Sequence, residues 1–192
     1  MPSGNFGNLT AGLLAYKMGL PVKRFLAATN INNTVPSYLF HGKYQAKPSV
    51  ATISNAMDVG APSNFSRMLD LFGNDGSTWN KMKDLIKGYS YNDTLTKEAM
   101  ISIKNEHKYI ADPHGAVAYL ACKEYLEKDQ TGNKHCVYLE TAHPGKFSEV
   151  VESTLNEELI LPMKLKVFLS KTKNAYTCNK DYNSFKELLI SL

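Results

Sequence analysis

The sequence predicts an α/β fold with a parallel sheet, and two neighbouring patterns near its start support that prediction. A glycine-rich loop at residues 2–8 leads into an apolar helical pattern over about 8–18, with Gly19 as a natural stop. The short apolar run at residues 23–29 follows and has the composition of a buried strand. Because a loop, a helix and a strand in this order form an α/β crossover, we expect parallel strands.

Polar segments follow the predicted strand at its carboxyl end, which is the edge where open α/β sheets bind ligands. Residues 30–36 are rich in Asn and Thr, which either cap a helix over residues 38–41 or face a ligand. Residues 48–64 are small and polar with few charges, a composition that favours a partly buried, ligand-lining loop. Asp58 is the only acid of this loop, and a lone Asp in a loop is more often a turn former than a catalyst.

The middle of the chain is predicted to be helical, with amphipathic segments separated by glycine and proline breaks. We expect a helix at about residues 65–72, a glycine turn and a helix within 74–87, a short strand or linker at 88–93, and helices at about 94–107 and 116–128. Leu95, Ala99 and Ile103 are expected to face the core from the third helix. Asp112 or His114 is expected to cap the fourth helix, and either side chain would reach the binding site if this helix points at it.

The last third of the chain contains a second strand-loop-helix pattern. Residues 135–140 are predicted to form a strand, the loop 141–147 follows, and a helix continues to about Leu155. Residues 159–180 are lysine-rich and are expected to be irregular. A final helix over 183–192 has apolar residues at helical spacing, and we expect it to dock on the rest of the domain.

Composition argues against several classes of function for this chain of 192 residues. The net charge of +4 comes from dispersed lysines, because Arg24 and Arg67 are the only arginines, and this argues against nucleic-acid binding. No apolar stretch approaches the ~20 residues that cross a bilayer, so no membrane partner is expected. Cys122, Cys136 and Cys178 form no CxxC pair, which is typical of reduced thiols in a cytoplasmic protein. The histidines show no metal-ligand spacing, so we expect no metal.

The opening loop is the strongest candidate for a binding site on chemical grounds. A backbone loop at a helix N-terminus presents several N–H groups and the positive end of the helix dipole, which suits a phosphate. The loop is not a nucleophile elbow, because its central residue is Asn5. It also lacks the GK[ST] ending of a nucleotide P-loop and the third glycine of a dinucleotide fingerprint. The phosphate of a smaller ligand remains as the physical option.

Six strings occur in a fixed order along nearly the whole chain. They are PSGNFGN at residues 2–8, AATN at 27–30, VP with YL at 35–39, ATISNAMDVG at 51–60, DPH at 112–114, and TAHP with KF at 141–147. In this order they resemble threonine synthase, a pyridoxal-phosphate enzyme of fold type II. The resemblance implies the parallel-sheet large domain of such an enzyme, with pyridoxal 5'-phosphate as cofactor. It also implies conversion of O-phospho-L-homoserine and water to L-threonine and phosphate, by elimination and hydration.

The same resemblance implies roles for individual residues. The cofactor phosphate would be held, mainly by backbone N–H groups, at Gly4, Asn5, Phe6, Gly7 and Asn8. Thr141 would lie near the pyridine nitrogen, where a hydroxyl, unlike a carboxylate, does not enforce a protonated ring. Candidates for the substrate side are Asn55, Asp58 and Lys146.

The chain departs from the family pattern ahead of the glycine loop. The family's cofactor lysine, which forms the Schiff base, lies upstream of that loop in a Phe-Lys-Asp setting that is absent here; Phe185-Lys186-Glu187 lies on the final helix instead. Residues 1–192 are therefore expected to be the C-terminal part of the catalytic domain, lacking the N-terminal strands and the small domain. We assign no catalytic residue, and we expect the chain alone to be inactive. The missing N-terminal part is its expected partner.

Two alternatives stay open at this point. The chain is a non-catalytic remnant that binds pyridoxal phosphate or phosphate, or it belongs to another fold-type-II lyase such as a cysteine synthase or a dehydratase. The string at residues 51–58 argues against the second alternative.

Overall fold

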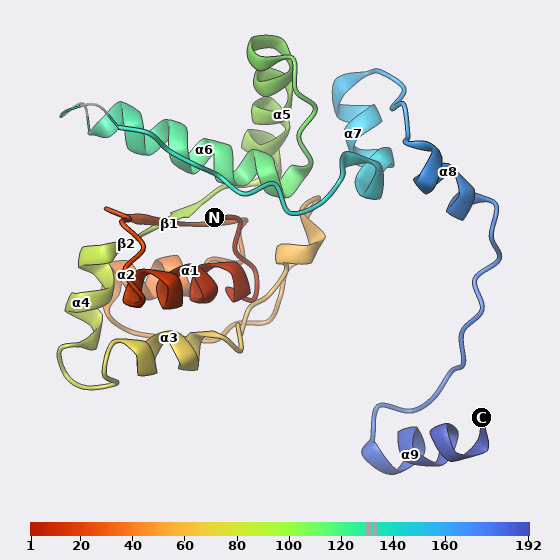
Figure 1. The fold of residues 1–192 in the computed structure, drawn as a ribbon, viewed down its shortest axis with the longest axis horizontal. Helices are drawn as coiled ribbons and strands as arrows, with labels where there is room; N and C mark the ends of the chain where they lie inside the picture. The colour runs from red at the N-terminus through yellow and green to blue at the C-terminus, as the bar shows by residue number, and fades with distance from the viewer. Residues whose placement is uncertain (130–131, 133) are drawn as a thin grey trace. The chain divides into compact units, whose positions relative to one another are not determined.

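The computed structural model describes residues 1–129, 132 and 134–192, which divide into two compact units, Met1–Leu159 and Ile160–Leu192. The first unit holds a small parallel sheet with helices on both faces, so the predicted α/β class is confirmed (Figure 1). Its helices and strands are α1 (Gly7–Lys17), β1 (Phe25–Thr29), α2 (Thr34–His41), α3 (Phe65–Leu71), α4 (Thr78–Leu85), β2 (Ile86–Ser90), α5 (Asp93–His107), α6 (Pro113–Lys128) and α7 (Ser148–Leu155). Two 3₁₀ turns join them, η1 (Asn55–Met57) and η2 (Pro144–Phe147).

Strand β1 has a hydrogen-bonded neighbour on each side. It pairs in parallel with β2, so that Phe25 lies opposite Ile86 and Thr29 opposite Ser90. On its other side, Ala28 forms a parallel bridge with Pro2. Every residue of β1 is buried, as expected for a parallel strand that is covered on both faces.

Successive side chains of a strand point to opposite faces, and in β1 this alternation divides the core. Phe25 and Ala27 pack in a cluster with residues of α1, α2, α3 and α4. Leu26 and Ala28 pack in a second cluster with α6. Figure 1 shows α1 to α4 on one side of the sheet and α5 and α6 on the other. The carboxyl edge of the strands is left for the loops that build the candidate site.

The predicted strand at residues 135–140 is wrong. Half-buried and exposed residues alternate through 134–140, but the segment is extended chain that belongs to no strand. Cys136 and Tyr138 pack against the α6 cluster, while Val137 is 81% exposed. A period of two predicts an extended backbone, but a strand also needs a hydrogen-bonding neighbour, and here the neighbour is a helix.

The expected core-facing stripe of α5 is partly wrong. Ala99 and Ile103 are buried as predicted, but Leu95 is 42% exposed. The buried stripe runs through Thr96, Ala99, Met100 and Ile103, with i, i+3, i+4 and i+7 spacing. Because Leu95 precedes this stripe by one residue, it is rotated by roughly 100° toward solvent.

The second unit contains α8 (Met163–Leu169) and α9 (Tyr182–Ser191). Helix α8 corrects the expectation that residues 159–180 are irregular. Asp181 caps α9 by accepting a hydrogen bond from the Ser184 N–H (2.9 Å). No residue of either helix is buried, so the docking of the final helix stays a prediction.

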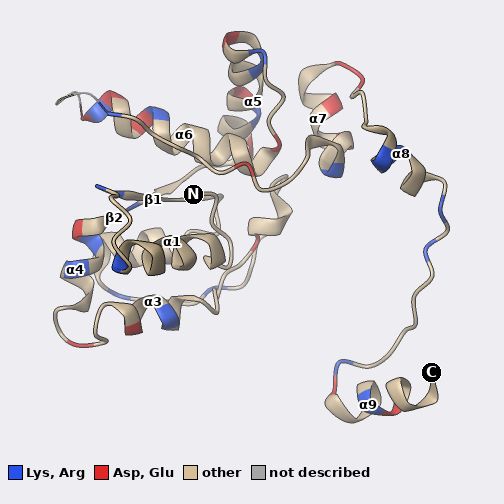
Figure 2. Cartoon of the chain, viewed as in Figure 1, with Lys and Arg blue, Asp and Glu red and all other residues tan. Residues whose placement is uncertain are grey.

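The charged side chains follow no single face of the first unit. Figure 2 shows Lys and Arg on several of its helices, interspersed with Asp and Glu. Among the described residues, no helix is both long and apolar enough to span a membrane.

Candidate functional site

The opening loop leaves the sheet at the carboxyl edge of β1. Met1 and the start of the loop pair with this strand, because the Ala28 N–H donates to the Met1 carbonyl (3.1 Å) and the Ser3 N–H donates to the Ala28 carbonyl (2.8 Å). Asn30 follows β1 at the same edge. The loop and the segment after Thr29 therefore lie beyond one edge of the sheet, as expected.

Phe6 sets the shape of the opening loop. It is the N-cap residue of α1 and has φ 61°, a left-handed conformation that costs a non-glycine residue roughly 1–2 kcal/mol. Its side chain is buried in the cluster formed by α1 to α4, so the ring's burial offsets this strain. Backbone strain of this kind is concentrated at binding sites.

The backbone of the opening loop has unused donors. Within the described residues, no backbone N–H of residues 4–8 has a hydrogen-bond acceptor, and the first donor of the helix is Thr10, which bonds to the Phe6 carbonyl (2.9 Å). The Asn5 side chain is engaged elsewhere, since its Oδ1 accepts the Ser63 N–H (2.6 Å). The side chain thus anchors the loop, and the backbone remains available to a ligand.

A hollow of 220 Å³ opens beside this loop and brings distant segments together. All six residues predicted to contact the cofactor line it: Gly4, Asn5, Phe6, Gly7, Asn8 and Thr141. The rest of its lining comes from Pro2, Ala56, Met57 and His114. The residues selected from the sequence are therefore neighbours in space, while their individual roles stay predictions.

Gly4 lies directly against the turn η1. A Cβ atom at this position would lie 2.7 Å from the Cα atom of Met57 and 2.9 Å from the carbonyl oxygen of Ala56. Both are backbone atoms, which cannot yield as a flexible side chain does. Glycine is therefore needed for the loop to approach this side of the hollow.

Asp112 and His114 form a buried pair at the start of α6. Asp112 caps the helix as predicted, because its Oδ1 accepts the backbone N–H of His114 (2.7 Å). The same oxygen accepts the Nδ1–H of His114 (2.7 Å), and His114 Nε2 accepts the Ala56 N–H (3.2 Å). The ring is therefore neutral, with its proton on Nδ1. His114 was expected either to cap this helix or to reach the binding site. Asp112 is the cap, and His114 lines the hollow.

Glu140 lies next to a residue of the hollow's lining, and sequence reasoning missed it. It precedes Thr141, and its Oε1 accepts the Asp112 N–H (3.1 Å). Burial and the neighbouring charge of Asp112 raise the pKa of Glu140 to about 7. The only available signal was a lone acid at the end of the wrongly predicted strand.

Asp58 holds its own loop together and is absent from the lining of the hollow. Its Oδ1 accepts hydrogen bonds from Thr52 Oγ1 (2.7 Å) and from Asn30 Nδ2 (2.8 Å). It also lies 3.2 Å from Asn32 Nδ2, and its Oδ2 accepts the Thr52 N–H (2.9 Å). This geometry matches the turn-forming role, which was the alternative to contact with the substrate.

The other two residues predicted for the substrate side are also absent from that lining. Asn55 is exposed at the start of η1. Lys146 is exposed on η2, with its ammonium group 5.6 Å from the centre of the Phe147 ring. Their contact with a substrate stays a prediction.

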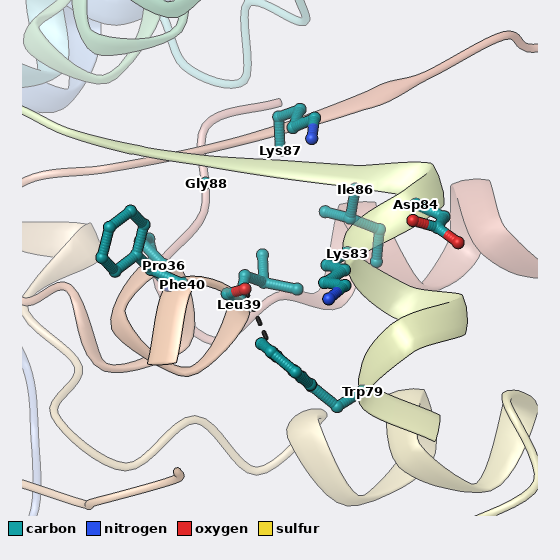
Figure 3. A pocket seen from close by; sticks show the side chains of 9 residues that line it. All are labelled: Pro36, Leu39, Phe40, Trp79, Lys83, Asp84, Ile86, Lys87 and Gly88. Carbon is teal, nitrogen blue, oxygen red and sulfur yellow. Dashed lines mark hydrogen bonds between the residues drawn. The ribbon is translucent and has the colours of Figure 1, made fainter. Parts of the chain in front are cut away.

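A second hollow, of 340 Å³, lies between α2, α4 and β2 (Figure 3). Figure 3 shows Trp79 reaching from α4 toward Leu39, and its indole N–H lies 3.1 Å from the carbonyl oxygens of both Tyr38 and Leu39. The ammonium group of Lys83 lies 3.8 Å from the centre of the Trp79 ring. These polar groups already have partners and no predicted site residue lines this hollow, so the hollow beside the opening loop is the better candidate.

Neither metal binding nor a nucleophilic Cys122 is supported by the described part of the chain. It contains no cluster of three or more His, Cys, Asp or Glu side chains that would hold a metal ion. Cys122 is buried on α6, and burial raises the pKa of its thiol to about 11. A thiol with so high a pKa is a poor nucleophile at neutral pH.

Comparison with known proteins identifies the family. The family model described as "Threonine synthase, C-terminal" matches residues 115–189. The threonine synthase of Serratia marcescens is 43% identical over 193 residues, which cover 100% of this chain and 43% of that protein. The crystal structure of threonine synthase from Escherichia coli matches with a TM-score of 0.85 at 42% identity. The match covers 99% of this chain and 42% of the Escherichia coli chain.

A third relative supports the fold alone. The structure of a threonine synthase with bound pyridoxal phosphate from Brucella melitensis matches with a TM-score of 0.84 at 24% identity. The match covers 98% of this chain and 44% of the Brucella chain. The chain thus spans about 43% of the length of the curated relatives that it matches. In sequence and in fold, it belongs to the threonine synthase family and corresponds to the C-terminal part of its members.

Proposed function

We propose that this chain forms one side of a pyridoxal 5'-phosphate site in a threonine synthase, which converts O-phospho-L-homoserine and water to L-threonine and phosphate. The observation that carries the proposal is the hollow, which a glycine loop at a helix N-terminus and a threonine far along the chain line together. The family relationship supports the choice of cofactor, substrate and reaction.

Residues 4–8 fit the cofactor's phosphate. Their backbone N–H groups have no acceptor among the described hydrogen bonds, and the N-terminus of the 11-residue helix α1 adds partial positive charge. The first turn of α1 carries no acidic residue that would repel an anion. Gly4 packs closely against η1, and any side chain at this position would collide with the backbone of that turn. We assign the phosphate to this loop.

Thr141 fits the cofactor's ring nitrogen. It is exposed in the hollow, and within the described residues its hydroxyl has no hydrogen-bond partner. Pyridoxal phosphate supplies an electron-withdrawing ring that stabilises negative charge on the substrate's carbons. A hydroxyl beside the ring nitrogen orients the ring without forcing a proton onto it, as a carboxylate would.

No lysine of the described residues lines the hollow. The described lining therefore offers no amine to anchor the cofactor covalently or to move protons at the substrate's carbons. We propose that a segment outside these 192 residues supplies that lysine, with the N-terminal part of a threonine synthase as the partner. The same observation favours a second candidate function, in which the chain binds pyridoxal phosphate or phosphate without catalysis.

An activity assay separates these possibilities. The purified chain is incubated with pyridoxal phosphate and O-phospho-L-homoserine, and released phosphate and threonine are measured. We expect no turnover by the chain alone, and measurable turnover would contradict the assignment of the lysine to another segment. Activity that appears on mixing with the N-terminal part of a related threonine synthase supports the enzyme, and continued inactivity of a complex that forms supports the binding remnant.

A cofactor titration tests the site itself. Pyridoxal phosphate is added to the chain and its absorbance is followed, with inorganic phosphate as competitor. We expect Gly4→Ala to weaken binding by about tenfold or more, because its Cβ would collide with the backbone of Met57 and Ala56. Gly76→Ala is the matched control, since a Cβ there would meet no atom within 4 Å. Equal affinity of wild type and Gly4→Ala would overturn the proposal.

A further inference from the structure

Two buried carboxyl groups meet where the segment carrying Thr141 crosses the start of α6. Glu140 Oε1 accepts the Asp112 N–H (3.1 Å), which joins that segment to the helix cap. Asp112 Oδ2 and Glu140 Oε2 are both buried, and neither has a hydrogen-bond donor within the described residues. Two carboxyl groups thus each leave one oxygen without a partner at the same junction.

Gly115 shows how tightly the Glu140 carboxyl is seated. A Cβ atom at Gly115 would lie 1.8 Å from Glu140 Oε2 and 2.4 Å from its Cδ atom. The carboxyl therefore rests directly on the backbone of the first turn of α6, in space that every other residue type would fill. This seat exists only because the helix has glycine at that position.

Two adjacent carboxylates that are removed from water repel each other when both are ionised, and one shared proton relieves the repulsion. Burial and the Asp112 charge raise the pKa of Glu140 to about 7, so its carboxyl is protonated in mildly acidic solution. The other titratable groups that face it are His114 on α6, Tyr109 before that helix and Tyr138 on its own segment. The two tyrosines have raised pKa values and carry no charge near neutral pH.

We propose that Glu140 is the positioning residue for Thr141: by sharing a proton with Asp112, it holds the segment that carries Thr141 on the first turn of α6. Asp112 also fixes His114, whose Nε2 accepts the N–H of Ala56, another residue that lines the hollow. One junction therefore sets the distance between Thr141 and the wall against which the glycine loop packs. The inference rests on the proposed function, in which Thr141 contacts the cofactor ring.

Ionisation of Glu140 is expected to weaken cofactor binding. The second negative charge would repel Asp112 and loosen the segment that carries Thr141. Glu140→Gln keeps an acceptor for the Asp112 N–H and carries a permanent donor for Asp112 Oδ2, so it imitates the protonated side chain. Glu140→Ala removes both, and the exposed Glu127→Gln on α6 is the matched control.

The test is a titration of the full chain with pyridoxal phosphate over a range of pH. The cofactor's own ionisation is the same for every variant, so the ratio of affinities isolates Glu140. We expect wild type to match Glu140→Gln near pH 6 and to bind about tenfold more weakly above about pH 8. Glu140→Ala should bind weakly throughout, and Glu127→Gln should follow wild type. A wild-type to Glu140→Gln ratio that does not change with pH would overturn the proposal.

Thermal unfolding of the unliganded chain separates a failure of this inference from a failure of the proposed function. The folded-state pKa of about 7 lies above the unfolded value, so the protonated carboxyl stabilises the fold at low pH. Relative to Glu140→Gln, the melting temperature of wild type should fall as pH rises from about 4.3 to about 7, and the difference should then level off. If this difference appears but pyridoxal phosphate does not bind at any pH, the shared proton of Glu140 and Asp112 is supported and the cofactor proposal fails. If the difference is absent, the pair is overturned.

Discussion

The two sides of the candidate site are held in place in different ways. The loop wall, residues 4–8 with residues 50–60, is tied down by several direct hydrogen bonds, such as those from Asn30 to Asp58 and from Ser63 to Asn5. The threonine wall, residues 140–147, is fixed to α6 by the Glu140–Asp112 junction and by the Phe147 ring, whose centre lies 4.6 Å from that of His114.

The loop wall is therefore preorganised, whereas the position of the threonine wall depends on protonation. The hydrogen bonds of the loop wall support one another and include no carboxyl–carboxyl pair, so the wall is formed before a ligand arrives. The junction of the threonine wall holds a carboxyl group that gains or loses a proton near neutral pH. The position of the phosphate is therefore expected to be constant, while the position of the ring partner depends on pH.

The largest effect is expected from Asp58→Ala, which breaks the loop wall. The substitution leaves the Asn30 and Asn32 amides and the Thr52 hydroxyl without the acceptor at the centre of their network. We expect the free energy of unfolding to fall by about 3 kcal/mol, measured by urea denaturation, and cofactor affinity to fall with it.

Asp70→Ala is the control for this substitution. Asp70 is an exposed residue of α3, and its loss should change the free energy of unfolding by less than about 0.5 kcal/mol. If Asp58→Ala matched this control, the hydrogen-bond network would not be what holds the loop wall.

The loop wall is also the part of the site that sequence reasoning predicted best. A glycine loop that feeds a helix, and a small polar segment with one acid, are local patterns whose conformations follow from neighbouring residues. The turn-forming role considered for Asp58 follows from the same local chemistry. The convergence of this loop with Thr141 came from the family resemblance, because no local pattern reports a contact across so many residues.

The threonine wall shows where sequence reasoning fails. The alternation at residues 135–140 predicts an extended backbone, and the segment is extended, but the pattern does not say that its neighbour is α6. Glu140 and Gly115 were missed because each is ordinary within its own segment. Their meaning arises only when a carboxyl group from one segment occupies the space that the missing Cβ of the other leaves.

A smaller effect is expected from Gly115→Ala, which disturbs the threonine wall. The new Cβ would overlap the Glu140 carboxyl, which is the end of a side chain and can move aside, so we expect a loss of about 1 kcal/mol in the free energy of unfolding. Adding Glu140→Ala should restore most of this loss, since it removes the group with which the Cβ collides. Simple additivity of the two substitutions would contradict the contact, and Gly76→Ala controls for the change from glycine to alanine.

The smallest effect on stability is expected from Thr141→Val, which keeps the shape of the threonine wall and removes its hydroxyl. Thr141 is exposed, so the free energy of unfolding should change by less than about 0.5 kcal/mol, while pyridoxal-phosphate affinity should fall about fivefold for one lost hydrogen bond. Thr141→Ser should retain wild-type affinity, and the exposed Thr94→Val should change neither quantity. Because an ionised Glu140 loosens this wall, the deficit of Thr141→Val should be full near pH 6 and should shrink above about pH 8. A deficit that is constant across this range would mean that the threonine wall is as fixed as the loop wall.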